Sequence, residues 1–275
     1  MSKVPVAAVI GHPVNHSRSP RMHNYWLAQF GLEGYYIPLD IDPKKFERSI
    51  RNLPELGFVG ANITIPYKEK VLKIADKISD RAALVGAANT LTFLQNGGIY
   101  ADNTDGYGFL QNIKSKYKDW SASEGISVVF GAGGASRAIL GALIEDGASD
   151  IILTNRTRAR ADQLRSDVGA KVEGVEWMKI QNYLSDASTI VNTTSLGMVG
   201  NTDLPIPLNT LKKNTLVTDI VYTPIETHLL ATATKMGCRT VDGLGMLIHQ
   251  AIPGFERWFG IKPGDSQSLR ELLIK

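Results

Sequence analysis

A glycine-rich loop between a buried strand and a helix constrains the fold of this chain most. The run Gly131-Ala132-Gly133-Gly134-Ala135-Ser136 directly follows an apolar segment at 126–130 and directly precedes a helical segment at 137–144. Such glycines allow a tight turn, and the helix start offers unpaired N–H groups to an anion. The pattern predicts a site for the pyrophosphate of a dinucleotide. Ser136 replaces the third glycine of the usual fingerprint, so a purely structural turn stays open.

Short apolar strands alternate with amphipathic helices before this loop, which favours a mostly parallel α/β sheet. Ser19 and Asp42 each precede a proline and are predicted as helix caps. We expect strands at 6–10, 36–39 and 61–65 and helices at 20–30, 43–53 and 68–78. A hairpin on the edge of the first domain is predicted around Asn96-Gly97-Gly98, between strands 90–94 and 99–101.

The same alternation resumes after the polar stretch 118–125. Strands are expected at 126–130, 151–154, 190–193, 216–220 and 240–241, and the last helices at 244–259 and from 269. A length of 275 residues fits two domains. We predict two α/β domains, 1–105 plus 243–275 and 106–242. The second is a Rossmann-type domain, and the C-terminal helices pack back on the first.

Composition narrows the class of protein further. With 43% apolar and 21% charged residues the chain is typical of a folded globular protein. A net charge of +3 argues against nucleic acid as a partner. The single cysteine, Cys238, rules out an internal disulfide and indicates the cytoplasm. No apolar run approaches the roughly 18 to 20 residues of a membrane-spanning helix.

Arginines follow the strand at 151–154, where an NAD site usually has an acidic residue for the ribose 2′-hydroxyl. The segment reads Asn155-Arg156-Thr157-Arg158-Ala159-Arg160. Guanidinium groups suit a 2′-phosphate by charge and by forked geometry. We therefore predict NADP as the cofactor, with Asn155, Arg156, Thr157 and Arg160 around its phosphate. A solvated basic helix start is the alternative.

Polar segments also follow the predicted strands of the first domain, where α/β folds bind ligands. These segments are 15–20, 62–68, Asn89 with 102–106, and 242–250. Together with 131–138, 155–157 and 192–198, they occur in the order seen in the shikimate dehydrogenase family. The chain resembles that family along nearly its whole length.

The resemblance implies reversible NADP-linked oxidation of shikimate to 3-dehydroshikimate, in the pathway to chorismate and the aromatic amino acids. It implies that Lys68 is the acid/base residue, with Asp105 beside it. Serines 17 and 19 would bind the substrate carboxylate. The hydroxyls would be bound by Thr64, Asn89, Asp105, Tyr222 and Gln250. Besides the phosphate-binding segment, the residues expected at the cofactor are Gly131, Ala132, Gly133, Gly134, Ala135, Ile220, Gly243, Met246 and, on weaker grounds, Asp80. Ala88 and Ile220 are small departures from the family pattern, where a β-branched residue and a methionine are frequent.

Several alternatives stay open from the residues alone. Lys68, within Lys68-Glu69-Lys70, could be a solvated charge, although it follows Pro66 at a strand end. A dual quinate/shikimate dehydrogenase would use the same chemistry, and a non-catalytic NADP-binding protein could keep the fold. His12, His16 and His23 lack the fixed spacing of metal ligands, so no metal is predicted. Monomer and homodimer are both compatible with the sequence.

Overall fold

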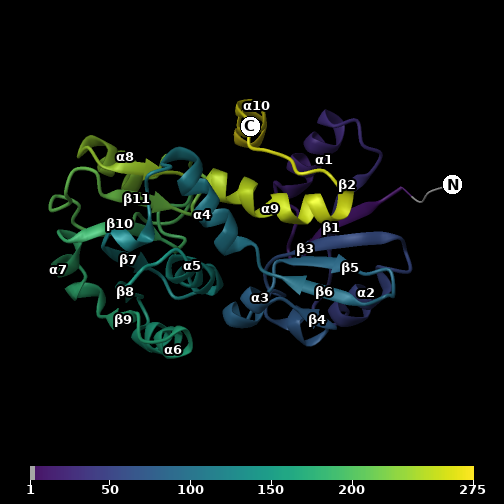
Figure 1. The fold of residues 1–275 in the computed structure, drawn as a ribbon, viewed down its shortest axis with the longest axis horizontal. Coiled ribbons are helices and arrows are strands. Elements are labelled where there is room, and N and C mark those ends of the chain that lie inside the picture. Colours follow the sequence, from purple (N-terminus) through teal and green to yellow (C-terminus); the bar gives the residue numbers. More distant parts are fainter. Residues whose placement is uncertain (1–3) are drawn as a thin grey trace. The chain divides into compact units, whose positions relative to one another are not determined.

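The computed structural model describes residues 4–275. The chain divides into two compact units, each containing one six-stranded sheet (Figure 1). Unit 1 is Met1–Thr104 with Ile248–Lys275, and unit 2 is Asp105–Leu247. The C-terminal segment thus packs with the first unit, as expected. The predicted domain boundaries, 105/106 and 242/243, refer to the functional domains and remain predictions.

The sheet of unit 1 is mixed, with the strand order β2-β1-β3-β5-β6-β4. Strand β1 pairs in parallel with β2 and β3, whereas β5 runs antiparallel to both β3 and β6. The strands are β1 Val6–Gly11, β2 Tyr35–Asp40, β3 Phe58–Ile63, β4 Lys77–Ile78, β5 Thr90–Phe93 and β6 Ile99–Asp102. The helices are α1 Ser19–Gln29, α2 Phe46–Asn52, α3 Asp80–Val85, most of α9 Gly243–Phe259, and α10 Gln267–Ile274.

The predicted helix at 68–78 is wrong. A single 3₁₀ turn at Lys70–Lys73 is followed by the short strand β4, which pairs in parallel with β6. The Asp76 carboxylate accepts a hydrogen bond from the backbone N–H of Ile99 at 2.7 Å. Pairing with β6 therefore overrides the local helical pattern. It also places β4, rather than the β5–β6 hairpin, at the edge of the sheet.

Both predicted helix caps are wrong as well. Helix α1 begins at Ser19 itself, and the cap position is held by Arg18 without a side-chain hydrogen bond. Helix α2 begins only at Phe46, because the Asp42 carboxylate accepts from the backbone N–H of Lys44 and so closes a turn before the helix. Ser19 is buried, which leaves its hydroxyl for contacts inside the unit.

An aromatic cluster in unit 1 surrounds a buried histidine. The ring of His23 stacks on Tyr36 with centroids 3.8 Å apart and also contacts Trp26, Phe255 and Trp258. Within residues 4–275, neither ring nitrogen of His23 has a hydrogen-bond partner. Burial lowers the pKa of His23 to about 3, so the ring stays neutral at physiological pH.

We expect His23 to destabilise unit 1 in acid. Its pKa is about 6.5 when unfolded and about 3 when folded, so the unfolded chain binds the extra proton. Stability is therefore present above pH 6.5 and is lost as the pH falls toward 3. Between pH 7 and pH 5, wild type should lose about 2 kcal/mol of unfolding free energy relative to His23→Phe. Urea unfolding at both values measures this difference. His16→Gln, at an exposed histidine, should follow wild type; parallel curves for His23→Phe and wild type would contradict the prediction.

Unit 2 has a fully parallel sheet with the strand order β12-β11-β10-β7-β8-β9. Its strands are β7 Ile126–Phe130, β8 Ile151–Thr154, β9 Val172–Val175, β10 Ala187–Asn192, β11 Leu216–Asp219 and β12 Arg239–Val241. Its helices are α4 Asp105–Lys116, α5 Gly134–Glu145, α6 Arg158–Val168, α7 Gln181–Leu184 and α8 His228–Lys235. The order reverses between β7 and β10, the switch point at which doubly wound sheets bind ligands. The edge strand β9 was not predicted.

Two separate apolar clusters pack on the strands of the second sheet. Ile139, Leu140 and Leu143 of α5 pack with Val129 and Leu153 of the sheet.

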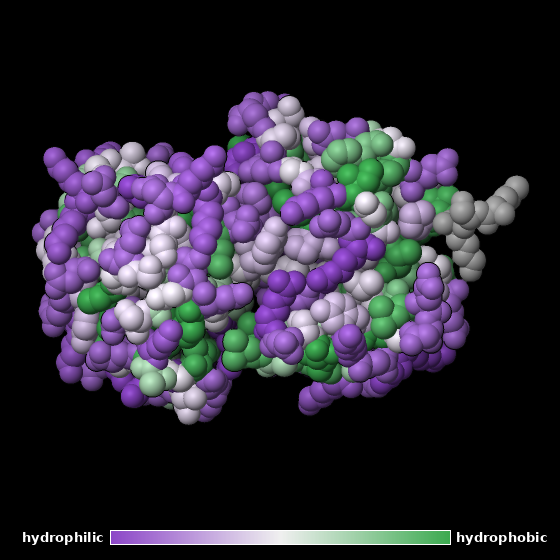
Figure 2. Space-filling view, viewed as in Figure 1, coloured by the Kyte–Doolittle hydropathy of each residue, from purple (hydrophilic) through white to green (hydrophobic). Residues whose placement is uncertain are grey.

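Mostly hydrophilic side chains cover the face seen in Figure 2, and hydrophobic ones form small separate patches there. Among residues 4–275, no helix has both the length and the apolar character needed to cross a lipid bilayer.

Candidate active site

Three of the predicted substrate residues lie together at the strand ends of unit 1. The backbone N–H of Thr64 donates to the Ile10 carbonyl at the end of β1, at 2.9 Å. The N–H of Ile63 donates to the carbonyl of Asn89, and the N–H of Ala88 donates to that of Lys68, both at 2.8 Å. These bonds hold the segments that carry Thr64, Lys68 and Asn89 side by side.

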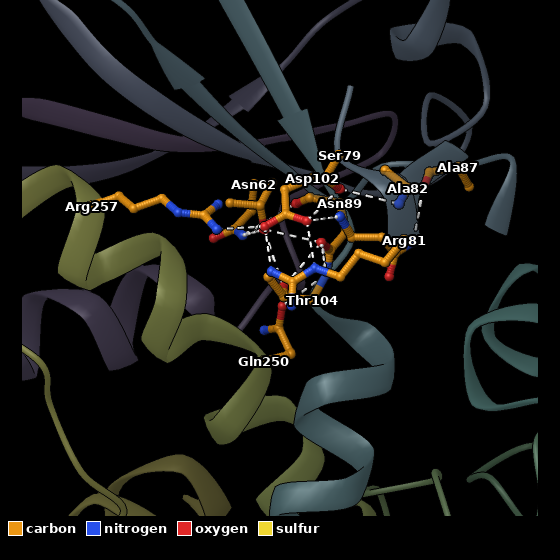
Figure 3. A network of polar contacts seen from close by, with 12 residues as sticks. Asn62, Ser79, Arg81, Ala82, Ala87, Asn89, Asp102, Thr104, Gln250 and Arg257 are labelled. Carbon is orange, nitrogen blue, oxygen red and sulfur yellow. Dashed lines mark hydrogen bonds and ion pairs between the residues drawn. The ribbon is translucent and has the colours of Figure 1, made fainter. Parts of the chain in front are cut away.

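The Asn89 side chain is oriented by its hydrogen bonds (Figure 3). Its Oδ1 accepts from the Thr104 backbone N–H at 2.8 Å and from the hydroxyls of Thr104 and Thr90 at 3.0 Å each. Its Nδ2 donates to Oε1 of Gln250 on α9 at 3.2 Å. Since a backbone N–H cannot change its role, the amide has one orientation. Asn89 and Gln250, 161 residues apart in sequence, thus belong to one polar group.

The two predicted serines flank the start of α1. The N–H of Ser19 donates to Oγ of Ser17 at 3.3 Å, and the N–H of Ser17 donates to the Val14 carbonyl at 3.0 Å. The loop before them is tied to β2, because Asp40 accepts from the N–H of Val14 and pairs with His12. The hydrogen bond from His12 lowers the pKa of Asp40.

A buried carboxylate anchors the segment that leads to Asp105. Asp102, at the end of β6, is fully buried and accepts from Arg81, Arg257 and the Ser79 hydroxyl (Figure 3). Burial raises the pKa of this carboxyl, but the hydrogen bonds from Arg81, Ser79 and Arg257 outweigh it and hold the pKa well below its usual range. Asp102 is therefore an anion, and through Arg81 and Arg257 it links helices α3 and α9 to the β5–β6 hairpin.

Two further predicted residues, Asp80 and Asp105, each lie at the start of a helix. Asp105 is the first residue of α4 and of unit 2, and it directly follows Thr104, which binds Asn89. Asp80 is an exposed first residue of α3, just after the capping Ser79. Within residues 4–275, no three His, Cys, Asp or Glu side chains are grouped as metal ligands.

The glycine loop of unit 2 lies between β7 and α5. Gly131 has φ +108°, and a Cβ there would lie 2.5 Å from the Thr193 hydroxyl, so only glycine fits. Beside Gly133 and Gly134 the space is open to at least 4 Å. Ser136 donates to the Gly131 carbonyl at 2.6 Å, which closes the turn and explains why the third glycine is dispensable. The N-cap residue of α5, Gly133, makes no side-chain cap hydrogen bond, so the first N–H groups of this helix have no side-chain acceptor from it.

The predicted phosphate-binding segment begins next to that loop. Gly131 donates its N–H to the Thr154 carbonyl at 2.8 Å, and Asn155 directly follows. The Asn155 side chain donates to the Thr157 carbonyl, which sets the turn into α6. Arg156 and Arg160 are exposed at the start of this helix. Positive charge here opposes the helix dipole, so a bound anion would relieve an unfavourable arrangement.

A buried polar network sets the loops after β10 and β11. Asn192 donates to Asp219 Oδ1 and accepts from the Thr194 N–H, both at 3.0 Å. Asp219 also accepts from the Val221 N–H and the Thr227 hydroxyl. Burial raises the pKa of Asp219, although the hydrogen bonds from Val221, Thr227 and Asn192 act to lower it. The network thus determines the path of the loop that carries the predicted residues Ile220 and Tyr222.

Ile220 lies beside the start of α9. A Cβ on Gly243 would lie 2.3 Å from the Ile220 carbonyl oxygen, so the close approach requires glycine. Met246, on the first turn of α9, packs with Ile220 against the same apolar cluster. The structure thereby brings the predicted cofactor residue Ile220 next to Gly243 and Met246, which lie together on the first turn of α9.

Comparison with known proteins agrees with this arrangement. Three family models match the chain: a shikimate dehydrogenase substrate binding domain at residues 9–91, shikimate/quinate 5-dehydrogenase at 113–244, and a shikimate 5′-dehydrogenase C-terminal domain at 243–267. A shikimate dehydrogenase (NADP(+)) of Roseobacter denitrificans is 53% identical over 100% of this chain and 99% of its own. The chain belongs to the shikimate dehydrogenase family.

Solved structures of this family share the fold. A shikimate 5-dehydrogenase from Thermus thermophilus, in complex with NADP(H) and shikimate, has a TM-score of 0.86 and 34% identity, with 98% of each chain covered. A quinate dehydrogenase from Corynebacterium glutamicum, in complex with NAD, has a TM-score of 0.89 and 32% identity, again over 98% of each chain. The predicted family and two-domain α/β fold are confirmed.

Sequence reasoning missed several residues that organise these sites. Thr90, Thr104 and Tyr36 carry the polar network of unit 1, and Asp219 with Thr227 that of unit 2. For Tyr36, Thr90 and Asp219 the available signal was a polar side chain within an otherwise apolar strand. Apart from the adjacent Asn89, the side-chain partners of Tyr36 and Thr90 are 14 to 28 residues away in sequence, so this signal does not show which residues are in contact.

Proposed function

We propose that this protein catalyses the reversible NADP-dependent interconversion of shikimate and 3-dehydroshikimate, a step toward the aromatic amino acids. The observation that carries the proposal is the 53% identity over its full length to a shikimate dehydrogenase (NADP(+)). The polar groups at the strand ends of unit 1 and the open glycine loop of unit 2 support the two halves of this reaction.

Substrate would bind at the strand ends of unit 1. Ser17 and Ser19 bind its carboxylate, as charge-assisted hydrogen bonds from hydroxyls favour an anion. Thr64, Asn89 and Gln250 bind ring hydroxyls, and Asn89 offers an amide whose orientation is already set. Asp105 and Tyr222 complete the set of hydroxyl ligands.

The residues of unit 2 fit NADP. The open space beside Gly133 and Gly134, at the uncapped start of α5, suits a pyrophosphate. Asn155, Arg156, Thr157 and Arg160 would bind the 2′-phosphate. Gly131, Ala132 and Ala135 complete the loop, Ile220, Gly243 and Met246 would line the nicotinamide pocket, and Asp80 is the remaining cofactor-side candidate. When bound, NADP supplies the hydride acceptor for oxidation.

Lys68 performs the proton transfer. During oxidation its Nζ accepts the proton of the reacting hydroxyl, while the hydride of the same carbon is removed. In reduction the Lys68 ammonium polarises the ketone and returns the proton to its oxygen. The family resemblance implies that Asp105 is the carboxylate that acts with Lys68 on the substrate hydroxyl.

The cellular setting follows from coarser features. The single cysteine supports a reducing compartment, the cytoplasm, and the net charge of +3 supports a small-molecule partner rather than nucleic acid. Monomer and homodimer both remain compatible with the proposal.

Steady-state formation of NADPH from shikimate tests the function directly. We expect turnover with shikimate and NADP that exceeds turnover with quinate or with NAD. Comparable kcat/KM values for quinate would favour the dual-specificity enzyme. No shikimate-dependent absorbance change with either cofactor would contradict the proposal and favour a non-catalytic NADP-binding protein.

Arg156→Asp should reverse the preference for NADP. The change removes a charge-assisted bond to the 2′-phosphate and adds an acceptor for a ribose hydroxyl. We expect the ratio of kcat/KM for NADP to that for NAD to fall at least about tenfold. Arg165→Asp, at an exposed position in the last turn of the same helix, is the control. An unchanged ratio in Arg156→Asp would show that the 2′-phosphate binds elsewhere.

A further inference from the structure

Successive turns of α9 meet consecutive residues of the segment 89–91, at the start of β5. The pairs in contact are Gln250 with Asn89, Gly254 with Thr90, and Trp258 with Leu91. The first is the side-chain hydrogen bond already described. In the second, a Cβ on the glycine would lie 3.3 Å from the threonine Cγ2. In the third, the indole N–H donates to the backbone carbonyl at 2.9 Å. Positions 250, 254 and 258 are each about one helical turn apart, so one face of α9 lies along this segment.

Two glycines form the slot that holds the Trp258 indole. A Cβ on Gly60 of β3 would lie 1.9 Å from the indole Nε1, and a Cβ on Gly254 would lie 2.9 Å from its Cη2. Both distances are well below the roughly 3.5 Å at which nonbonded heavy atoms make contact. Neither position therefore accepts a side chain unless the ring moves. Trp258 is only 5% exposed, and the mechanism above gives it no role.

The indole fixes the position of α9 along the segment more strictly than the other contacts of this helix do. Apolar packing is non-directional and tolerates sliding. Arg257 donates to Asp102 at 2.6 Å, but its long side chain is 30% exposed and can follow a displaced helix (Figure 3). The indole ring is rigid, and its N–H reaches one particular carbonyl.

The turn between Gln250 and Trp258 depends on contact with the sheet. Helix α9 is continuous from Gly243 to Phe259 but contains Pro253, followed by Gly254. Proline and glycine are the two poorest helix formers, and proline also lacks the N–H that would bond to the preceding turn. Intrinsic helix propensity therefore contributes little to this turn, and Trp258 provides the hydrogen bond to the sheet that follows it.

We propose that Trp258 is a positioning residue of the substrate site. By fixing α9 on the sheet, it sets where the Gln250 amide meets Asn89 and hence where Gln250 meets a ring hydroxyl of the substrate. Trp258 acts on the substrate through Gln250. The inference rests on the proposed function, which makes Gln250 a hydroxyl ligand.

Steady-state kinetics of Trp258→Phe test the inference. The change keeps an aromatic side chain but leaves the Leu91 carbonyl without its donor and the slot partly empty, so α9 is no longer fixed along the segment. We expect kcat/KM for shikimate to fall about tenfold, mainly through a higher KM, the size of one lost hydrogen bond to the substrate. KM for NADP should change less than about twofold.

Trp120→Phe is the matched control. Trp120 of unit 2 is 4% exposed, and its indole N–H donates to the Thr189 hydroxyl at 3.0 Å. This variant loses the same kind of buried hydrogen bond away from α9, so KM for shikimate should stay within about twofold of wild type. A wild-type kcat/KM in Trp258→Phe would overturn the inference, as would equal losses of kcat/KM in the two variants or an equal rise of KM for NADP.

A double-mutant cycle with Gln250→Ala tests the route. If Trp258 acts through Gln250, adding Trp258→Phe to Gln250→Ala should lower kcat/KM by less than about threefold further. A further tenfold loss would overturn the route. Should Trp258→Phe not fold, Gly254→Ala carries the test, because alanine favours the helix while its Cβ enters the slot of the indole. The same rise of KM for shikimate is then expected, and an unchanged KM would overturn the inference.

The wild-type assay separates the two proposals. An inactive wild type contradicts the proposed function and this inference together. An active wild type with an equally active Trp258→Phe contradicts the inference alone.

Discussion

Replacing Lys68 with alanine is expected to lower kcat for shikimate oxidation at least about a hundredfold, the usual effect of losing an acid/base group. The alanine leaves the reacting hydroxyl without a proton acceptor, while the backbone bond from Ala88 to the carbonyl of residue 68 is retained. The local strand ends should therefore keep their positions. Initial rates of NADPH formation at saturating shikimate and NADP measure the change.

Lys70→Ala is the matched control for this variant. Lys70 lies two residues further on, at the exposed start of the 3₁₀ turn, and should leave kcat within about twofold of wild type. A loss of less than about tenfold in Lys68→Ala would assign the proton transfer to another group. Equal losses in both variants would indicate a general effect of positive charge.

Asp102→Asn is expected to lower the unfolding free energy at pH 7 by about 2 kcal/mol, because the carboxylate is fully buried and its neutral amide can no longer accept hydrogen bonds from both arginines and from the Ser79 hydroxyl. The amide would turn a donor toward one of the two guanidinium groups that now donate to the carboxylate. The pKa of Asp102 is lowered on folding, so its contribution is present above pH 4 and is lost below it. The difference from wild type should therefore narrow in acid. Urea unfolding at pH 7 and near pH 3.5 measures both effects.

Asp119→Asn provides the comparison. Asp119 pairs with Arg239 at 2.7 Å, but its side chain is 67% exposed. Water screens such a pair, so this variant should lose no more than about 1 kcal/mol. If Asp102→Asn lost no more than Asp119→Asn, the Asp102 cluster would not be what holds α3 and α9 to the hairpin.

A dual quinate/shikimate dehydrogenase would bind its substrate with the same residues at the strand ends of unit 1. A quinate dehydrogenase matches this chain over 98% of its length with 32% identity, so the fold does not separate the two substrates. The arginines at the start of α6 favour NADP over NAD. Relatives that match 99% or more of the chain at 53% and 54% identity are shikimate dehydrogenases (NADP(+)), which favours shikimate, and the kinetic comparison tests this preference.

Much of unit 2 was predictable because its signals are local. Each parallel strand is a short apolar run, and the glycine loop adjoins both the strand and the helix that it connects. Unit 1 was less predictable where an element depends on a distant partner. The segment after Lys68 has helical spacing, yet Lys77 and Ile78 pair with Tyr100 and Ala101. The edge strand β9 was missed for the same reason, since β8 stabilises it.

By itself the sequence determined the family, the alternation of strands and helices, and the residue types available for hydride and proton transfer, since these depend on spacing along the chain. The tertiary structure alone decided which buried polar groups pair. Tyr36 meets Asn62, Asn89 meets Gln250, and Asp102 meets two arginines because a buried donor or acceptor must find a partner wherever the fold brings one within reach. Such contacts depend on distances in space that no local pattern encodes.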